Sequence, residues 1–245
     1  MIWDCFTYNG EDDLVKIRCQ ELVGLGVRHV LIESNYTFTG KWKELKYNKN
    51  LNDNIEYFVA NHLPNNGNAW DNEKAQRNYI LNALQILGAS DNDIVIISDV
   101  DEIIKSSVIG NYTPISTLTA LKMDTYRYYY NCLEGHQNWN MARIMNFSYL
   151  KEKSPDEVRN SGFERVIDNA GWHFSYMGGY EKIIEKIESF SHTELNTEEF
   201  KSKLSFKHEN CQSLFGDDYW SIVEIDNSYP SEIVNNIDLY KNHIK

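Results

Sequence analysis

The sequence lacks any apolar run of the roughly 18–20 residues that a helix needs to cross a bilayer. Its first residues, Met-Ile-Trp-Asp-Cys-Phe, include an acid and lack the basic stretch that opens a secretory signal peptide. We therefore expect no membrane span and no signal peptide, and we expect the protein to be cytoplasmic.

Positive charge is also scarce. The 24 Lys and Arg residues are outnumbered by 36 Asp and Glu residues, which leaves a formal net charge of −12 with His neutral. Such a surface repels phosphate backbones and anionic lipid headgroups, which argues against partners such as nucleic acid or a membrane surface. A phosphate-bearing ligand would need a local device, such as a metal ion, to offset the carboxylates.

Cysteine is sparse, and its four copies form no CxxC pair. Scattered cysteines favour reduced thiols over disulfides or a zinc site. The remaining composition, 42% hydrophobic and 24% charged over 245 residues, is that of an ordinary globular domain. Aromatic residues reach 13%, which fits either a rich core or a site that stacks on flat ligands such as sugars and bases.

Strand-like and helix-like segments alternate through the first hundred residues. Helical spacing begins at residue 12 and again at 73–87, and short apolar runs predict strands at 2–7, 30–33, 55–60 and 94–97. This alternation is typical of a mostly parallel, Rossmann-like sheet flanked by helices. We therefore expect an α/β fold in a single domain. The second half is less regular, with a Tyr-rich strand predicted at 125–132 and a helix at 181–190.

The sharpest feature is the run Asp99-Val100-Asp101-Glu102, directly after the predicted strand 94–97. Ligands of parallel sheets bind at the carboxyl ends of strands, which is where this run falls. If the segment is extended, Asp99 and Asp101 point the same way and share one ion while Val100 faces the core. Oxygen ligands of this kind suit Mn²⁺ or Mg²⁺, with phosphates completing the shell. The alternative is an acidic turn in contact with water.

Two reaction classes use an Asp-x-Asp pair at a strand end. One is nucleotide-sugar transfer. The other is phosphate hydrolysis of the haloacid-dehalogenase type, in which the first Asp is the nucleophile. The phosphatase has some support from Gly216-Asp217-Asp218, but Ile103 stands where that class has Thr. A carbohydrate-binding module without catalysis is a third interpretation of the aromatic content.

Nucleotide-sugar transfer also gives a role to residues upstream. Arg77 lies on the helix that precedes the acidic strand end, where a guanidinium could hold a base, ribose or pyrophosphate. Glu33 follows the second predicted strand and could accept hydrogen bonds from ribose or uracil. Both side chains could equally be solvated charges on the surface.

Four segments in order together resemble glycosyltransferase family 17, the family of β-1,4-mannosyl-glycoprotein 4-β-N-acetylglucosaminyltransferase. They are Glu33-Ser34-Asn35-Tyr36-Thr37-Phe38-Thr39-Gly40, the helix from Trp70 through Gln76-Arg77-Asn78, Ile97-Ser98-Asp99-Val100-Asp101-Glu102-Ile103, and Gly171-Trp172-His173-Phe174-Ser175-Tyr176. The resemblance implies a GT-A-like fold, a UDP-sugar donor such as UDP-GlcNAc, a glycan or glycoconjugate acceptor, Mn²⁺ or Mg²⁺, and inversion at the anomeric carbon. It divides the chain into a nucleotide-sugar-binding half, about 1–105, and an acceptor-binding half, about 106–245.

The resemblance also suggests roles for single residues. It implies a metal site of Asp99, Asp101 and His173, with His192 as a second candidate ligand. It places the donor nucleotide near Glu33, Asn35, Arg77, Asp99 and Val100, and the acceptor near Trp139, Arg143 and Trp172. Inversion needs a carboxylate that takes a proton from the acceptor. Glu194 is the first candidate, before Glu164, Asp168 and Asp217, whereas Glu102, a further member of the catalytic set, is expected to orient the metal loop.

Overall fold

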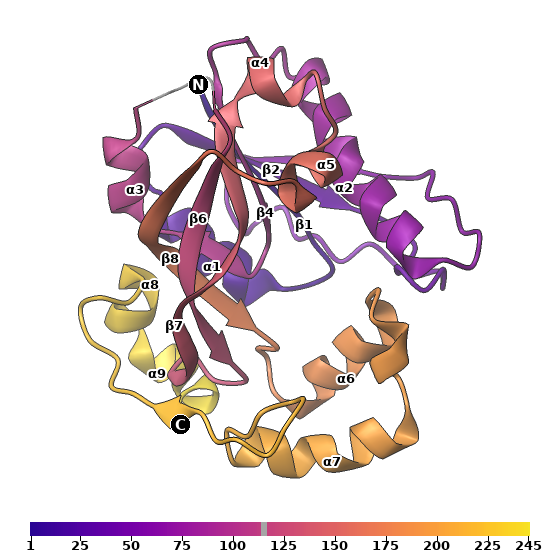
Figure 1. Ribbon diagram of the computed structural model, residues 1–245, viewed down its shortest axis with the longest axis vertical. Helices are drawn as coiled ribbons and strands as arrows, with labels where there is room; N and C mark the ends of the chain where they lie inside the picture. Colours follow the sequence, from indigo (N-terminus) through magenta and orange to yellow (C-terminus); the bar gives the residue numbers. More distant parts are fainter. Residues whose placement is uncertain (114–116) are drawn as a thin grey trace.

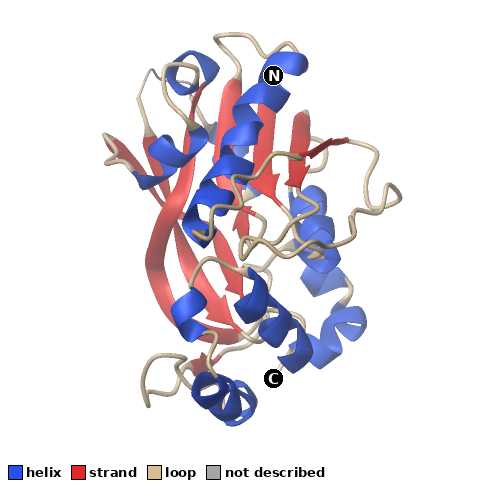
Figure 2. Ribbon diagram, turned by 90° about the vertical axis from the view of Figure 1, so that its right-hand side faces the viewer, coloured by secondary structure: helices blue, strands red, loops and turns tan. Residues whose placement is uncertain are grey.

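The computed structural model describes residues 1–113 and 117–245. One mixed β-sheet runs through the molecule in the order β3-β2-β1-β4-β7-β6-β8-β5, and β9 pairs with β7 (Figure 1). Its strands are β1 (Ile2–Thr7), β2 (Val27–Glu33), β3 (Ile55–Val59), β4 (Ile94–Asp99), β5 (Glu102–Ile104), β6 (Thr119–Arg127), β7 (Cys132–Asn146), β8 (Arg165–Ser175) and β9 (Ser221–Ile222). Figure 2 shows the sheet curling along its long strands.

The half of the sheet built from β1 to β4 is parallel, as the alternation of strands and helices predicts. β1 pairs with β2 on one side and β4 on the other, and β2 also pairs with β3. The strands β1, β2 and β4 form here because most of their apolar residues are buried, on both faces of the sheet. Thr7 at the end of β1 lies opposite Asp99 at the end of β4, so these carboxyl ends share one edge.

The other half of the sheet is mixed. β7 runs antiparallel to β4, β6 and β9, and β8 runs parallel to β6 but antiparallel to β5. The Tyr-rich strand expected at 125–132 is only partly formed: β6 ends at Arg127 and the chain then turns into β7. Tyr128 begins this turn with a φ of 68°, in the left-handed region, which an extended strand does not use.

Helices cover both faces of the sheet (Figures 1 and 2). They are α1 (Asp12–Glu21), α2 (Ala69–Ile86), α3 (Ser106–Asn111), α4 (Phe147–Leu150), α5 (Pro155–Asn160), α6 (Tyr180–Ser189), α7 (Glu198–Glu209), α8 (Ser231–Asn235) and α9 (Ile237–Tyr240), with 3₁₀ turns at Thr193–Leu195 and Lys241–His243. Alternate residues of β1 pack into two different hydrophobic cores, one on each face of the sheet. Phe6 packs with α1, whereas Trp3 and Cys5 pack with α2 on the opposite face.

Strand β8 approaches β5 so closely that one position admits only glycine. A Cβ atom built on Gly171 would lie 2.1 Å from the main-chain oxygen of Ile103. This contact sets His173 of β8 opposite Glu102 of β5 and places the main-chain N–H of Phe174 2.8 Å from the oxygen of Asp101.

None of the helices in residues 1–113 and 117–245 combines the length and the apolar character that crossing a bilayer requires.

Candidate functional site

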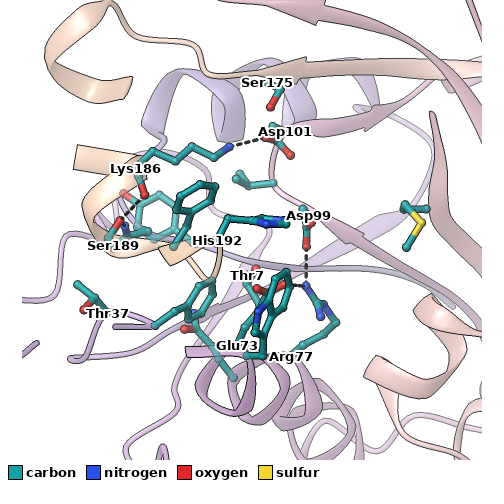
Figure 3. A pocket seen from close by; sticks show the side chains of 18 of the residues that line it. Thr7, Thr37, Glu73, Arg77, Asp99, Asp101, Ser175, Lys186, Ser189 and His192 are labelled. Carbon is teal, nitrogen blue, oxygen red and sulfur yellow. Dashed lines mark hydrogen bonds and ion pairs between the residues drawn. The ribbon is translucent and has the colours of Figure 1, made fainter. Parts of the chain in front are cut away.

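A cavity of about 870 Å³ opens at the carboxyl ends of β1 and β4. Helix α2, helix α5, strand β8 and helix α6 complete its walls, so residues from both halves of the chain face it (Figure 3). Among the predicted site residues, the cavity is lined by Arg77, Asp99, Val100, Asp101, Trp139, His173, His192 and Glu194. Its position agrees with the general rule for ligands of parallel sheets.

Asp99 and Asp101 do not point the same way, which corrects the expectation that they share an ion on an extended segment. Strand β4 ends at Asp99, and the chain turns at Val100 and Asp101 before β5 begins. The twofold alternation of a strand therefore does not apply across the pair. Figure 3 shows the Asp99 carboxylate directed toward Arg77 and the Asp101 carboxylate directed toward Lys186. Val100 is buried against the core and also lines the cavity.

Two arginines hold the carboxylate of Asp99. Arg159 of α5 donates to Oδ2 at 2.6 Å, and Arg77 of α2 lies 3.4 Å from Oδ1. Burial alone would raise the pKa of Asp99, but these two guanidinium groups outweigh it and hold the pKa well below its usual value. Asp99 therefore carries a full negative charge that the arginines balance.

Arg77 takes part in a network of ion pairs and is not a solvated surface charge. Besides Asp99, it contacts Glu73 one turn earlier on α2 and Asp156 of α5, the latter at 2.6 Å. Its guanidinium is almost completely buried, although it lines the cavity. Arg77 thus links α2 and α5 to the end of β4, and its charge is largely used within the protein.

Glu102 organises the turn from beneath the cavity. Its side chain is fully buried and accepts hydrogen bonds from the main-chain N–H of Asp99 at 2.7 Å and from Arg159 at 2.7 and 2.8 Å. The indole N–H of Trp139 donates to the same carboxylate. Glu102 therefore supports the position of Asp99 and Trp139, which the expected orienting role requires, but it does not line the cavity itself.

Asp101 faces two basic side chains. Lys186 of α6 lies 2.9 Å from Oδ2, and Nε2 of His173 lies 3.8 Å from Oδ1. Burial alone would raise the pKa of Asp101, but Lys186 and His173 outweigh it and the pKa lies below its usual value. Burial lowers the pKa of His173 more than Asp101 and Glu102 raise it, so its imidazole is neutral near pH 7. His173 also stacks on Trp139, with ring centroids 4.1 Å apart.

Asp101 and His173 are the candidate metal ligands of the cavity. In the described part of the chain, no group of three or more His, Cys, Asp or Glu side chains is arranged to hold one. Asp101 Oδ1 and the neutral imidazole of His173 are nevertheless two suitable ligand types, and 3.8 Å is slightly wider than the about 3–3.5 Å that separates neighbouring ligands on one small cation. This pair fits a cation whose other ligands come from outside the protein, whereas the oxygens of Asp99 face arginines.

Two residues of the predicted nucleotide site, Glu33 and Asn35, lie outside the cavity lining. The buried carboxylate of Glu33 accepts hydrogen bonds from Lys43, from Tyr57 and from the main-chain N–H groups of residues 46 and 47. It therefore fastens the loop after β2 instead of facing a ligand. Asn35 belongs to the same loop, where its main-chain oxygen accepts from the N–H of Lys43.

Two residues of the predicted acceptor site, Arg143 and Trp172, also lie elsewhere. Arg143 is buried, and its guanidinium donates to main-chain oxygens of residues 140, 142 and 161. Trp172 belongs to the hydrophobic core that contains α1, because it and His173 are neighbours on one strand and face opposite sides. Trp139 is the member of this set that lines the cavity.

Glu194 lines the cavity with an exposed side chain, and its carboxylate lies 2.7 Å from Nδ1 of His192. The hydrogen bond from His192 is the main cause that lowers the pKa of Glu194. The other carboxylates considered for proton transfer lie outside this cavity. Glu164 accepts the main-chain N–H of residue 118, Asp168 pairs with Lys122 on the surface, and Asp217 lines an adjoining pocket that shares Glu194 with the cavity.

The sequence did not point to several residues of the site. Arg159 and Lys186 were not expected because charged residues on short helices usually face water. Asn9 and Glu11 follow β1, and the rule for the carboxyl ends of strands could have identified them. Both line the cavity, and the side-chain oxygen of Asn9 is buried with no hydrogen-bond partner among the residues described.

The model of the family described as glycosyltransferase family 17 matches residues 1–243. A comparison with curated proteins finds no match. A galactosyltransferase, LgtC, solved in complex with donor and acceptor sugar analogs, is 12% identical with a TM-score of 0.36, over 63% of this chain and 61% of that chain. An active-site mutant of LgtC gives 10% identity, the same TM-score and the same coverage. This chain thus spans less than two thirds of the length of either structure.

The family match covers all of the residues that line the cavity. The acidic turn after β4 and the His173 segment, which carried the resemblance in the sequence, meet at Asp101. The chain therefore belongs to glycosyltransferase family 17.

Proposed function

We propose that this protein transfers a sugar, GlcNAc, from a UDP-sugar to a glycan or glycoconjugate acceptor with inversion, assisted by Mn²⁺ or Mg²⁺. One observation carries the proposal: Asp101 and His173, which come from opposite halves of the chain, lie within 3.8 Å of each other in a cavity of about 870 Å³. A cavity of this size accommodates a nucleotide sugar.

In this proposal the nucleotide lies at the carboxyl end of β1. Asn9, which lines the cavity after β1, would contact the base in place of the enclosed Glu33. The diphosphate would then extend toward Asp101.

Asp101 and the neutral imidazole of His173 would hold the cation, and the diphosphate would complete its ligands. When bound, the cation neutralises negative charge that develops on the leaving diphosphate. Asp99 acts indirectly, because its carboxylate holds Arg77 and Arg159 at the edge of the cavity.

The acceptor would enter beside Trp139 and Glu194. Its hydroxyl oxygen attacks the anomeric carbon, the bond from that carbon to the diphosphate breaks, and UDP leaves with the bonding electrons. Glu194 accepts the hydroxyl proton as the new glycosidic bond forms. Its low pKa keeps the carboxylate ionised, and its hydrogen bond to His192 orients it.

Calorimetric titration of UDP-GlcNAc with and without Mn²⁺ tests the donor site. We expect binding by the wild type that depends on the metal, and at least tenfold weaker binding by the Asp101→Asn and His173→Ala variants. Asp168→Asn removes a surface carboxylate that pairs with Lys122 and is the matched control, with unchanged affinity.

The same titration with UDP-glucose and GDP-mannose identifies the donor. Equal affinity of Asp101→Asn and wild type for UDP-GlcNAc with Mn²⁺ would falsify the assignment of the cation site. Hydrolysis of p-nitrophenyl phosphate that depends on Asp99 would instead favour a phosphatase. Binding of free sugars with no response to UDP would favour a carbohydrate-binding module.

A further inference from the structure

Lys186 forms an ion pair with the carboxylate of Asp101, which is also a ligand of the proposed cation. It extends from α6 into the cavity, and its ammonium lies 2.9 Å from Oδ2 of Asp101 (Figure 3). The other oxygen of that carboxylate faces His173. The ammonium also lies 5.1 Å from the ring centroid of Tyr176, on the same side of the cavity.

A divalent cation at Asp101 and the ammonium of Lys186 would repel each other strongly at this distance. The Asp101 side chain is only 8% exposed, so water screens the two charges poorly. The ammonium therefore has to leave Asp101 when the cation binds. Lysine can move in this way, because its charge sits on a flexible four-carbon chain.

The arginines of the site have less freedom to move. Arg159 is held by Asp99 and Glu102, and Arg77 is held by Glu73, Asp99 and Asp156. Arg127, which also lines the cavity, pairs with Glu134. A diphosphate that enters the cavity therefore meets three guanidinium groups whose charges carboxylates already balance. An ammonium released from Asp101 loses its one ion pair among the described residues, although the charge of Glu11 still reaches it, and it lies beside the same carboxylate that directs the cation.

We propose that Lys186 is a displaceable counter-ion. In the free protein its ammonium neutralises the carboxylate of Asp101. When a divalent cation binds Asp101, the ammonium moves away and pairs with the donor diphosphate instead. This inference rests on the proposed function, since it needs a cation at Asp101 and a diphosphate beside it. It makes Lys186 both a competitor of the metal and a ligand of the donor, and these two roles have opposite effects on binding.

The test compares Lys186→Met with wild type in two titrations that need no turnover. Binding of Mn²⁺ alone, followed by calorimetry or by the electron paramagnetic resonance signal of free Mn²⁺, is expected to be at least threefold tighter in the variant. Binding of UDP at saturating Mn²⁺ is expected to be at least tenfold weaker. Lys182→Met is the matched control on the same helix, since Lys182 is exposed and pairs with Glu185, and both affinities should stay at wild-type values.

Lys186→Arg keeps the positive charge and should restore most of the UDP affinity without the gain in Mn²⁺ affinity. Thermal melting of each variant reports whether α6 remains folded. Weaker or unchanged Mn²⁺ binding by a folded Lys186→Met variant overturns the inference, and so does unchanged or tighter UDP binding. If wild type binds Mn²⁺ but not UDP, the proposed function fails instead.

Discussion

The guanidinium of Arg18 lies 2.7 Å from the main-chain oxygen of Glu102 and 3.1 Å from that of Asp99. One buried side chain of α1 thus holds both ends of the acidic turn. Arg18 is itself fixed by a bidentate ion pair with Asp4 of β1, and both side chains are fully buried. The turn is therefore set by the core beneath it as well as by the arginines that face the cavity.

Replacement of Arg18 by Met should destabilise the protein strongly. The change leaves the buried charge of Asp4 without its main partner, and loss of one member of a buried ion pair costs about 3–5 kcal/mol. Urea unfolding measures this loss. Lys151→Met is the control: Lys151 and its partner Asp91 are both exposed, and the expected loss is below about 1 kcal/mol. Equal losses in the two variants would contradict the clamping role of Arg18.

Acid should destabilise the protein through the same pair. Burial alone would raise the pKa of Asp4, but Arg18 and His29 outweigh it and hold the pKa well below its usual value. The contribution of Asp4 to the free energy of unfolding is therefore complete above its unfolded pKa of about 3.9 and declines as the pH falls toward the lower folded value. Urea midpoints between pH 6 and pH 3 should show a decline below about pH 4. A midpoint independent of pH over this range would exclude the effect.

Replacement of Gly171 by Ala should separate β5 from β8. The added methyl group would lie 2.1 Å from the main-chain oxygen of Ile103, so the strands must move apart, and we expect a loss of at least about 2 kcal/mol. Donor affinity should fall as well, because the same contact positions Asp101 against His173. Gly162→Ala is the control, since no described neighbouring atom lies within 4 Å of the position that its added methyl group would take, and its stability should change by less than about 1 kcal/mol.

Replacement of Glu194 by Gln should reduce transfer without weakening donor binding. The amide keeps the size of the carboxylate but cannot accept the proton, and general base catalysis contributes about 10²–10⁴-fold to rates. Release of UDP in the presence of an acceptor measures kcat, and calorimetry measures donor affinity. If kcat stays within threefold of wild type, another group accepts the proton.

The parallel half of the sheet could be predicted from sequence because its signals are local. A continuous Ile and Val run defines β4, a short apolar and aromatic run defines β1, and the predicted strand 2–7 has the bounds of β1. Helix α2 begins at Ala69, earlier than predicted, because Asn68 caps it by accepting the N–H of Trp70. The mixed half depends on pairings between distant segments, which periodicity does not reveal.

The sequence could locate single residues of the candidate site, but it could not identify the distant residues that pair with them. The position of Asp101 follows from a strand end, but its partner Lys186 lies 85 residues away along the chain. The ion pair of Glu102 with Arg159 spans 57 residues. Whether a charged residue on a helix faces water or a buried carboxylate depends on how that helix packs, so Asp99 and Glu33 could be located but not assigned their partners.

The continuous segment from β8 into α6 carries both His173 and Lys186 to Asp101. Between them, Gly178 and Gly179 adopt φ values of 97° and 85°, which lets the chain reverse within a few residues. A single residue inserted into or deleted from α6 ahead of Lys186 would rotate the Lys186 side chain by about 100° about the helix axis. The number of residues between His173 and Lys186 is therefore itself a determinant of the site, which point substitutions leave unchanged but insertions and deletions do not.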